Sequence, residues 1–94
     1  MNSGYNEPPD QISDSARDMH QALASLQEEL AAIDFYQQRI DLCEEEELQA
    51  ILIHNMETKT ECVTMLLEWL RRNYELFDKD FKAILFGEDP IAGE

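Results

Sequence analysis

The sequence predicts an all-α fold, in which a long antiparallel hairpin of two helices is followed by one short helix. Two long segments carry apolar residues at helical spacing, and no Gly or Pro interrupts the chain from Gln11 through Phe86. No segment alternates apolar and polar residues with the period of a strand. Because two helices cannot enclose a core, we expect two copies to pair into a four-helix bundle.

The chain divides into an arm, one helical domain and a tail. Residues 1–12 contain Pro8-Pro9 and scattered polar groups, which predicts a flexible N-terminal arm. The hairpin and the short third helix occupy 13–87, with Ser13 or Asp14 as the expected N-cap. Residues 88–94 form a loose C-terminal tail.

The first helix has one apolar seam, whose steps alternate between three and four residues as in a heptad repeat. Its members are Ala16, Met19, Leu23, Leu26, Leu30, Ile33 and Ile40, with Gln37 at the missing step. The pattern breaks around Asp41-Leu42-Cys43. The run from Glu44 to Glu47 is predicted to form the first turn of the second helix, whose positive dipole end favours carboxylates.

The second helix carries two apolar stripes, which predicts that it is covered from two sides. One stripe is Leu48, Ile51, Asn55, Thr58, Cys62, Met65 and Trp69, and the other is Leu52, Met56, Lys59, Val63, Leu66 and Leu70. We expect Met65, Leu66, Trp69 and Leu70 in the core. Arg71-Arg72 should cap the carbonyl end and pair with acidic residues. The third helix should begin near Asp78, bury Phe81, Ile84, Leu85 and Phe86, and end at Gly87.

Charge restricts the partners of this chain. Its 94 residues include 21 Asp and Glu against 7 Lys and Arg, a net charge of −14. This balance excludes nucleic acid and anionic membrane surfaces as partners and favours cations. No segment reaches the roughly 18 apolar residues of a membrane span. Cys43 and Cys62 are too far apart along the helices for a disulfide, which fits a reducing cytosol.

Polar residues interrupt both helices at the same height. If the turn is centred near Glu44, Glu29 and Lys59 each lie 15 residues from it and should face each other. Cys62 follows Lys59 by one helical turn, Glu28 flanks Glu29, and Tyr36 lies two turns along the same helix. Two interpretations stay open: an ion pair that fixes the register with Cys62 as apolar filler, or a metal site.

A second set of candidate ligands lies on the second helix. His54, Glu57 and Glu61 are spaced so that one imidazole and two carboxylates share a helical face. The alternative is a solvated polar face with a hydrogen-bonded His54. Glu28, Asp34 and the run from Glu44 to Glu47 could hold hydrated cations or simply be solvated.

Three blocks of sequence resemble the encapsulated ferritins. They are Leu26-Gln27-Glu28-Glu29-Leu30 continuing through Arg39, then Ala50-Ile51-Leu52-Ile53-His54-Asn55, and Leu67-Glu68-Trp69-Leu70-Arg71-Arg72-Asn73. The resemblance covers residues 14 to 91. It implies a two-helix protomer, half a ferritin, which dimerises around a di-iron ferroxidase centre that oxidises Fe(II) to Fe(III) with dioxygen. It further implies a ring, typically a decamer, carried as cargo within an encapsulin nanocompartment of a bacterial or archaeal cytoplasm.

The resemblance also assigns the centre's residues. The family supplies one Glu from the first helix and a Glu-x-x-His from the second. Glu29 matches the first ligand, whereas Lys59 and Cys62 stand at the other two positions, and Tyr36 matches an aromatic residue near the metal. A protonated lysine cannot coordinate iron, and its charge opposes cation binding.

Three functional hypotheses follow from this comparison. The first is an iron-metabolism protein whose ferroxidase centre is degenerate at Lys59 and Cys62. The second is an active ferroxidase with a rearranged di-metal site, using Glu29 with Cys62 or the face of His54, Glu57 and Glu61. The third is a non-catalytic helical-hairpin interaction protein, which would explain the heptads but not the three sequence blocks.

Overall fold

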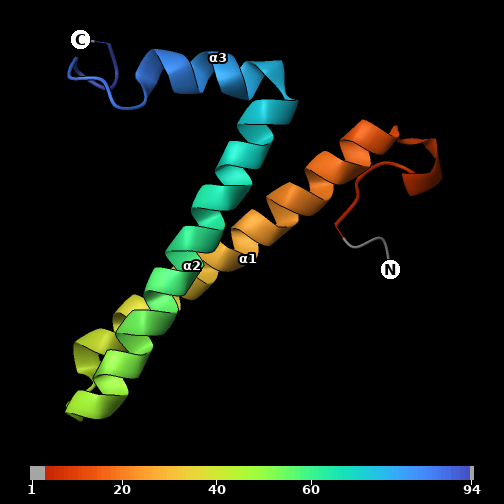
Figure 1. Ribbon diagram of the computed structural model, residues 1–94. Helices are drawn as coiled ribbons and strands as arrows, with labels where there is room; N and C mark the ends of the chain where they lie inside the picture. Colours follow the sequence, from red (N-terminus) through yellow and green to blue (C-terminus); the bar gives the residue numbers. More distant parts are fainter. Residues whose placement is uncertain (1–3, 94) are drawn as a thin grey trace.

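The computed structural model describes residues 4–93, and these contain helices and no strand, so the all-α prediction is confirmed. The elements are η1 (Pro9–Gln11), α1 (Asp14–Leu42), α2 (Glu46–Asn73) and α3 (Glu75–Ile84). Helices α1 and α2 form the antiparallel hairpin, and α3 turns sharply away from the end of α2 (Figure 1). Residues 1–3 of the predicted arm and residue 94 of the tail lie outside the described range.

Part of the N-terminal arm is folded against α1. Its short helix η1 is followed by Ile12, and the Arg17 side chain donates a hydrogen bond to the Pro9 carbonyl oxygen at 2.9 Å. The Tyr5 ring lies over the His20 ring, with centroids 4.0 Å apart. The described part of the arm is therefore held by contacts with the first turns of α1.

Side chains cap the N-termini of both long helices. Ser13 is the N-cap of α1, as predicted, and its hydroxyl accepts the Ala16 amide at 3.1 Å. The glutamate run is divided between the turn and α2. Glu45 is the N-cap and its carboxylate accepts the amides of Glu47 and Leu48, while Glu46 and Glu47 form the first turn. Carboxylates at this end satisfy free amides and complement the helix dipole.

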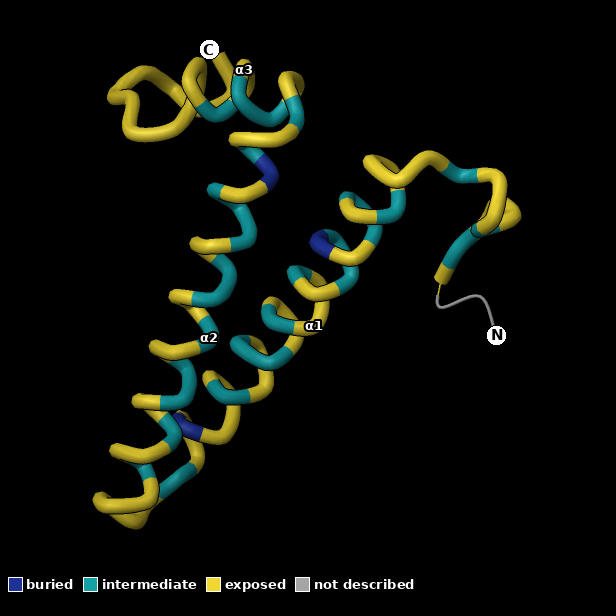
Figure 2. Tube along the Cα trace, turned by 45° about the vertical axis from the view of Figure 1, so that its right-hand side comes forward, coloured by how far each residue is buried: buried dark blue, intermediate teal, exposed yellow. Residues whose placement is uncertain are grey.

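One register holds along the whole hairpin. Near the turn, the Gln49 amide donates to the Ile40 carbonyl oxygen at 3.0 Å; halfway along, Lys59 contacts Glu29. At the far end, where the ribbons of α1 and α2 spread apart, the Tyr74 hydroxyl donates to the Ser15 carbonyl oxygen at 2.7 Å (Figures 1 and 2). Each of these pairs is almost equidistant from Glu44, which confirms the predicted centre of the turn.

The single hairpin buries little. Within residues 4–93 the buried hydrophobic residues are Ala22, Ile40 and Leu70, which appear as three short dark segments on α1 and α2 (Figure 2). The stripe of α2 from Leu52 to Leu70 is half-buried or buried throughout. In contrast, Met65 and Trp69 of the other stripe are 58% and 38% exposed, so the prediction that they are core residues is wrong for the single chain. A hairpin has only one mate to cover α2, and the second stripe remains open.

The seam of α1 also differs from the prediction. Leu30 and Gln37 are exposed, whereas Glu29 and Tyr36 are half-buried. The stripe that is buried or half-buried at every step is Ala22, Leu26, Glu29, Ile33, Tyr36 and Ile40. The expected seam and this stripe share Leu26, Ile33 and Ile40. Between these positions, the polar Glu29 and Tyr36 are turned toward α2.

Helix α3 begins earlier and ends earlier than predicted. It starts at Glu75, and Tyr74 is both the C-cap of α2 and the N-cap of α3, so Asp78 lies in the first turn and is not the cap. The helix ends at Ile84, before Gly87, and just beyond this end Phe86 has a left-handed backbone, at φ 62°. Ile84, Leu85 and Phe86 are exposed, so the predicted apolar face is only half-buried at Phe81.

A chain of ion pairs joins α2 to α3; we call it the elbow, and it consists of Glu68, Arg71, Arg72, Asp78 and Lys82. Arg71 binds Glu68 through two hydrogen bonds of 2.8 Å and reaches Asp78 at 2.6 Å. Arg72 and Lys82 extend the chain at its two ends. The hydrogen bonds from Arg71 and Arg72 lower the pKa of Glu68 from 4.5 to about 2. Those from Lys82 and Arg71 lower the pKa of Asp78.

Candidate metal centre

Glu29 and Lys59 meet between the middle turns of α1 and α2. The Lys59 ammonium donates a hydrogen bond to Oε1 of Glu29 at 3.4 Å and lies 3.3 Å from Oε2. The Glu29 side chain is 20% exposed and the Lys59 side chain 36% exposed, so both are partly shielded from water. The predicted pairing of these two residues is therefore confirmed.

The two carboxylate oxygens of Glu29 differ in their surroundings. Oε1 accepts the lysine hydrogen bond, whereas Oε2 is shielded from solvent and receives no directed hydrogen bond. The short distance from Nζ to Oε2 gives Coulomb attraction without the donor angle of a hydrogen bond. Since an ionised carboxylate accepts several hydrogen bonds, Oε2 retains unused acceptor capacity.

The residues gathered here do not fit a di-iron centre. An iron pair of the ferritin type needs several carboxylates and imidazoles, and this site offers one carboxylate, one ammonium and one thiol. Cys62 is half-buried and free, and it follows Lys59 by one helical turn; Cys43 is also free. The ammonium already supplies the positive charge that Glu29 would otherwise take from a metal.

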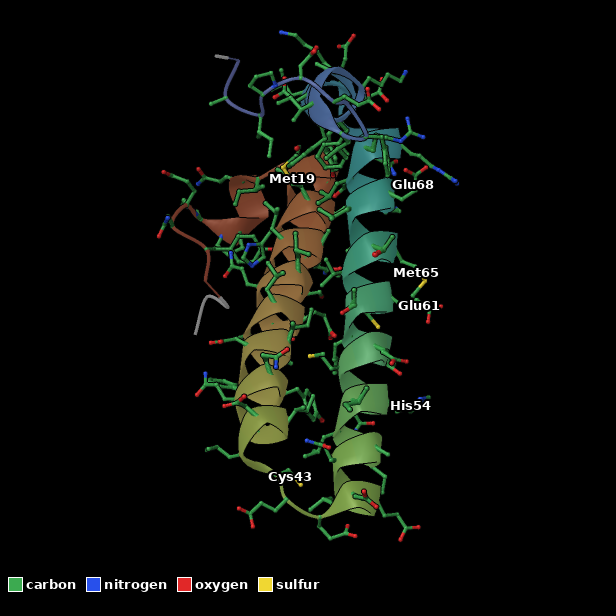
Figure 3. All side chains as sticks on the ribbon, turned by 90° about the vertical axis from the view of Figure 1, so that its left-hand side faces the viewer. Met19, Cys43, His54, Glu61, Met65 and Glu68 are labelled. Atoms are coloured by element: carbon green, nitrogen blue, oxygen red, sulfur yellow. The ribbon has the colours of Figure 1, made fainter. Side chains whose placement is uncertain are left out.

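The second candidate set lies on a different face. His54, Glu57 and Glu61 are all exposed, and Figure 3 shows His54 and Glu61 pointing away from α1. Within residues 4–93, no three His, Cys, Asp or Glu side chains come together closely enough to hold a metal ion. In the single chain, these three residues are therefore part of the solvated surface of α2.

The remaining candidate residues of α1 do not join the pair. Glu28 is exposed. Asp34 accepts a hydrogen bond from Gln38 at 3.3 Å on the exposed side of α1. Tyr36 is half-buried, and the Arg39 guanidinium lies 5.3 Å from the centre of its ring. These contacts position surface side chains of α1.

Two contacts of the structure were not predicted from the sequence. Tyr74 closes the open end of the hairpin through Ser15, a contact that the same count from Glu44 would have found. The elbow contact of Arg71 with Asp78 spans the break between α2 and α3, so helical spacing gave no reason to place these residues together. The more general prediction that Arg71 and Arg72 pair with acidic residues is confirmed.

Comparison with known proteins places the chain in a family. A family model described as EncFtn-like matches residues 4–88. An encapsulated ferritin-like protein of Rhodospirillum rubrum is 41% identical over 87 residues, which are 93% of this chain and 62% of that protein. A ferritin-like protein of Thermotoga maritima is 40% identical over 92 residues, covering 98% and 81% of the two chains. The chain thus spans less than two thirds of the Rhodospirillum relative.

A solved structure agrees with this placement. The crystal structure of a Nitrosomonas europaea protein superposes with a TM-score of 0.89 at 52% sequence identity, covering 95% of this chain and 98% of the other. Within the described residues, no helix is long and apolar enough to cross a membrane. The fold and the sequence matches lead to one conclusion: the chain belongs to the EncFtn-like family, as its three sequence blocks predicted.

Proposed function

We propose that this chain is a ferritin-like assembly subunit in which an ion pair replaces the di-iron centre of the family. The observation that carries the proposal is the contact of Lys59 with Glu29 at 3.3 and 3.4 Å. Glu29 is the one family ligand retained, and its carboxylate is engaged by the residue that stands in place of a second ligand. The centre has lost both donor atoms and negative charge.

Electrostatics favours the ion pair over iron at this position. An incoming Fe(II) would have to displace a partly shielded ammonium from Glu29 and then sit within a few ångströms of it, where like charges repel. Cys62 offers a thiol in place of the imidazole, and iron oxidation beside a thiol exposes it to oxidation. Both substitutions oppose ferroxidase chemistry at this centre.

Assembly is the second part of the proposal. The chain exposes 7726 Å², whereas a folded monomer of its mass of 10.9 kDa exposes about 5,600 Å². The excess of about 2,100 Å² is in the range that each partner of an obligate dimer buries. We therefore propose a homodimer that completes a four-helix bundle, and higher assembly of such dimers into a ring.

The biological setting follows from the names of the relatives. The Rhodospirillum protein is named an encapsulated ferritin-like protein, and the Thermotoga protein a ferritin-like protein. By analogy we place this chain in iron metabolism, as cargo of an encapsulin shell in a bacterial or archaeal cytoplasm. With a degenerate centre, its contribution there is structural, in its own assembly or in one mixed with an iron-oxidising relative.

Anaerobic Fe(II) titration by calorimetry tests the proposal. The parent chain should show no stoichiometric site, and any weak uptake by the acidic surface should vanish as salt is raised. Glu29→Gln and its exposed neighbour Glu28→Gln form a matched pair of variants. Stoichiometric, salt-resistant binding that is lost in Glu29→Gln and kept in Glu28→Gln would contradict the proposal and favour the active ferroxidase. Such binding kept in both variants would also contradict it and would direct the search to His54, Glu57 and Glu61.

A further inference from the structure

The open stripe of α2 can face the α2 of a second copy. In a two-fold interface the same surface meets itself, so residue i contacts residue j and j contacts i. The stripe runs from Leu48 to Trp69, and its midpoint lies between Thr58 and Lys59. An antiparallel pairing about this midpoint sets exposed Leu48 against exposed Trp69, and half-buried Asn55 against half-buried Cys62. The apolar ends match apolar ends, and the polar centre meets itself.

Charge selects the antiparallel arrangement. Helix α2 begins with Glu46 and Glu47, preceded by Glu44 and Glu45, and it ends with Arg71 and Arg72. Parallel pairing would bring the glutamates of both copies together. Antiparallel pairing sets the acidic end of one α2 beside the basic end of the other and also opposes the two helix dipoles.

The ion pair lies at the centre of this arrangement. Lys59 belongs to the neighbouring, half-buried stripe and is level with this midpoint, so the two copies of Lys59 lie at the same height on either side of the axis. Each ammonium makes one hydrogen bond within its own chain, to Oε1 of Glu29, and is 36% exposed. Each Glu29 retains the shielded Oε2, which has no directed donor. Because Oε2 is enclosed within its own chain, a donor from a second copy would reach Glu29 through the 20% of its side chain that remains exposed.

We propose that two copies of this chain close around a quartet of two Lys59 and two Glu29, in which Lys59 of each copy also donates to Glu29 of the other. The inference rests on the proposed function, because it names what occupies the centre in place of iron. Alternating the signs around the axis balances two positive against two negative charges. Partly shielded charges are tolerated when each is paired and hydrogen-bonded, and the quartet gives each ammonium a second carboxylate partner.

A mixing experiment separates contacts between chains from contacts within a chain. Glu29→Gln and Lys59→Met are prepared as full chains in metal-free buffer with chelator, and dimerisation is measured by sedimentation. Each variant alone should dimerise about tenfold more weakly than the parent, because each leaves unpaired charges at the axis. When the two are mixed, a heterodimer keeps one Glu29 and one Lys59 on opposite chains.

The share of heterodimer in the mixture shows whether Lys59 and Glu29 pair between chains. Native mass spectrometry should show the heterodimer well above the one-half share of random pairing. A heterodimer share at or below one half, or single variants that dimerise as tightly as the parent, would overturn the quartet. If either variant fails to fold, the charge-exchanged chain Glu29→Lys with Lys59→Glu replaces it and should dimerise within about threefold of the parent; a monomer at the parent's dimer concentration would contradict the proposal.

The two proposals fail in different experiments. The dimerisation measurements contain no iron, so they test the quartet alone. Stoichiometric Fe(II) binding by the parent would overturn the metal-free centre whatever the heterodimer share. An iron-free parent with random pairing of the two variants would keep the metal-free centre and reject the quartet.

Discussion

Lys59 of α2 and Glu29 of α1 are joined across the middle of the hairpin by an ion pair with Nζ 3.3 Å from Oε2. Partial shielding places this pair between an exposed surface pair and a fully buried one. Lys59→Met should therefore lower the free energy of unfolding by about 1–2 kcal/mol. Urea unfolding followed by circular dichroism measures the change. An exposed lysine of α3 outside the elbow, in the variant Lys79→Met, serves as the matched control and should stay within about 0.5 kcal/mol of the parent.

Ser13 caps α1 through its hydroxyl, which accepts the Ala16 amide at 3.1 Å. Ser13→Ala should lower the free energy of unfolding by about 1 kcal/mol, because it leaves that amide without its partner. Ser13→Asp should retain the cap. Ser25→Ala, an exposed serine within the same helix, is the control. If Ser13→Ala and Ser25→Ala gave equal urea midpoints, the cap would have no measurable role.

Tyr74 holds the open end of the hairpin through its hydroxyl, 2.7 Å from the Ser15 carbonyl oxygen. Tyr74→Phe removes this hydrogen bond and keeps the ring, which lies edge-on to Trp69 at 5.7 Å between centroids. We expect a loss of about 0.5–1 kcal/mol, since the bond is exposed to water. Amide exchange should accelerate in the first turns of α1 and the last turns of α2. Acceleration spread evenly over the hairpin would contradict a local role.

The elbow should depend on pH in a direction set by Glu68. Its pKa falls from 4.5 to about 2 on folding, so the folded state binds fewer protons than the unfolded state between these values. Its contribution to stability is complete above about pH 4.5 and is lost as pH falls through about 2. Carboxyl NMR titration should give Glu68 a pKa near 2 in the parent.

Two arginine variants separate the contributions to that shift. Arg71→Gln should move the pKa of Glu68 back toward 4.5 by more than Arg72→Gln does, because Arg71 makes the larger contribution and also contacts Asp78. Only Arg71→Gln should free α3 from α2, measured as faster amide exchange in residues 75–84. Equal effects of the two variants on α3 would show that Arg71 does not position it.

Local rules predicted much of this structure. Serine is preferred at N-caps, so α1 begins where the sequence indicated; acidic residues favour the start of a helix, and α2 begins within the predicted glutamate run, at Glu46. In an antiparallel hairpin with a tight turn, residues that are equally far from the turn in sequence lie level with each other. For this reason the pairing of Glu29 with Lys59 could be predicted from the sequence. The family's motif positions then gave the pair a chemical meaning.

Other features depend on contacts that no local pattern encodes. Two apolar stripes on α2 are equally plausible core faces, and only packing shows that Leu70 is covered while Met65 is not. On α1, Leu30 continues the heptad better than Glu29 does, yet Lys59 draws Glu29 inward. Asp78 has the chemistry of an N-cap, but its bond to Arg71 places it inside α3, which begins at Glu75 with Tyr74 as the N-cap.

Restoring the family's ligands shows whether Lys59 and Cys62 keep iron from the centre. The parent chain and the double variant Lys59→Glu with Cys62→His are loaded with Fe(II) without oxygen, oxygen is admitted, and Fe(III) absorbance is followed. We expect an inert parent and rapid oxidation by the double variant, because the exchange removes an ammonium and supplies a carboxylate and an imidazole beside Glu29. Oxidation by the parent at the rate of the double variant would contradict a metal-free centre at Glu29 and Lys59.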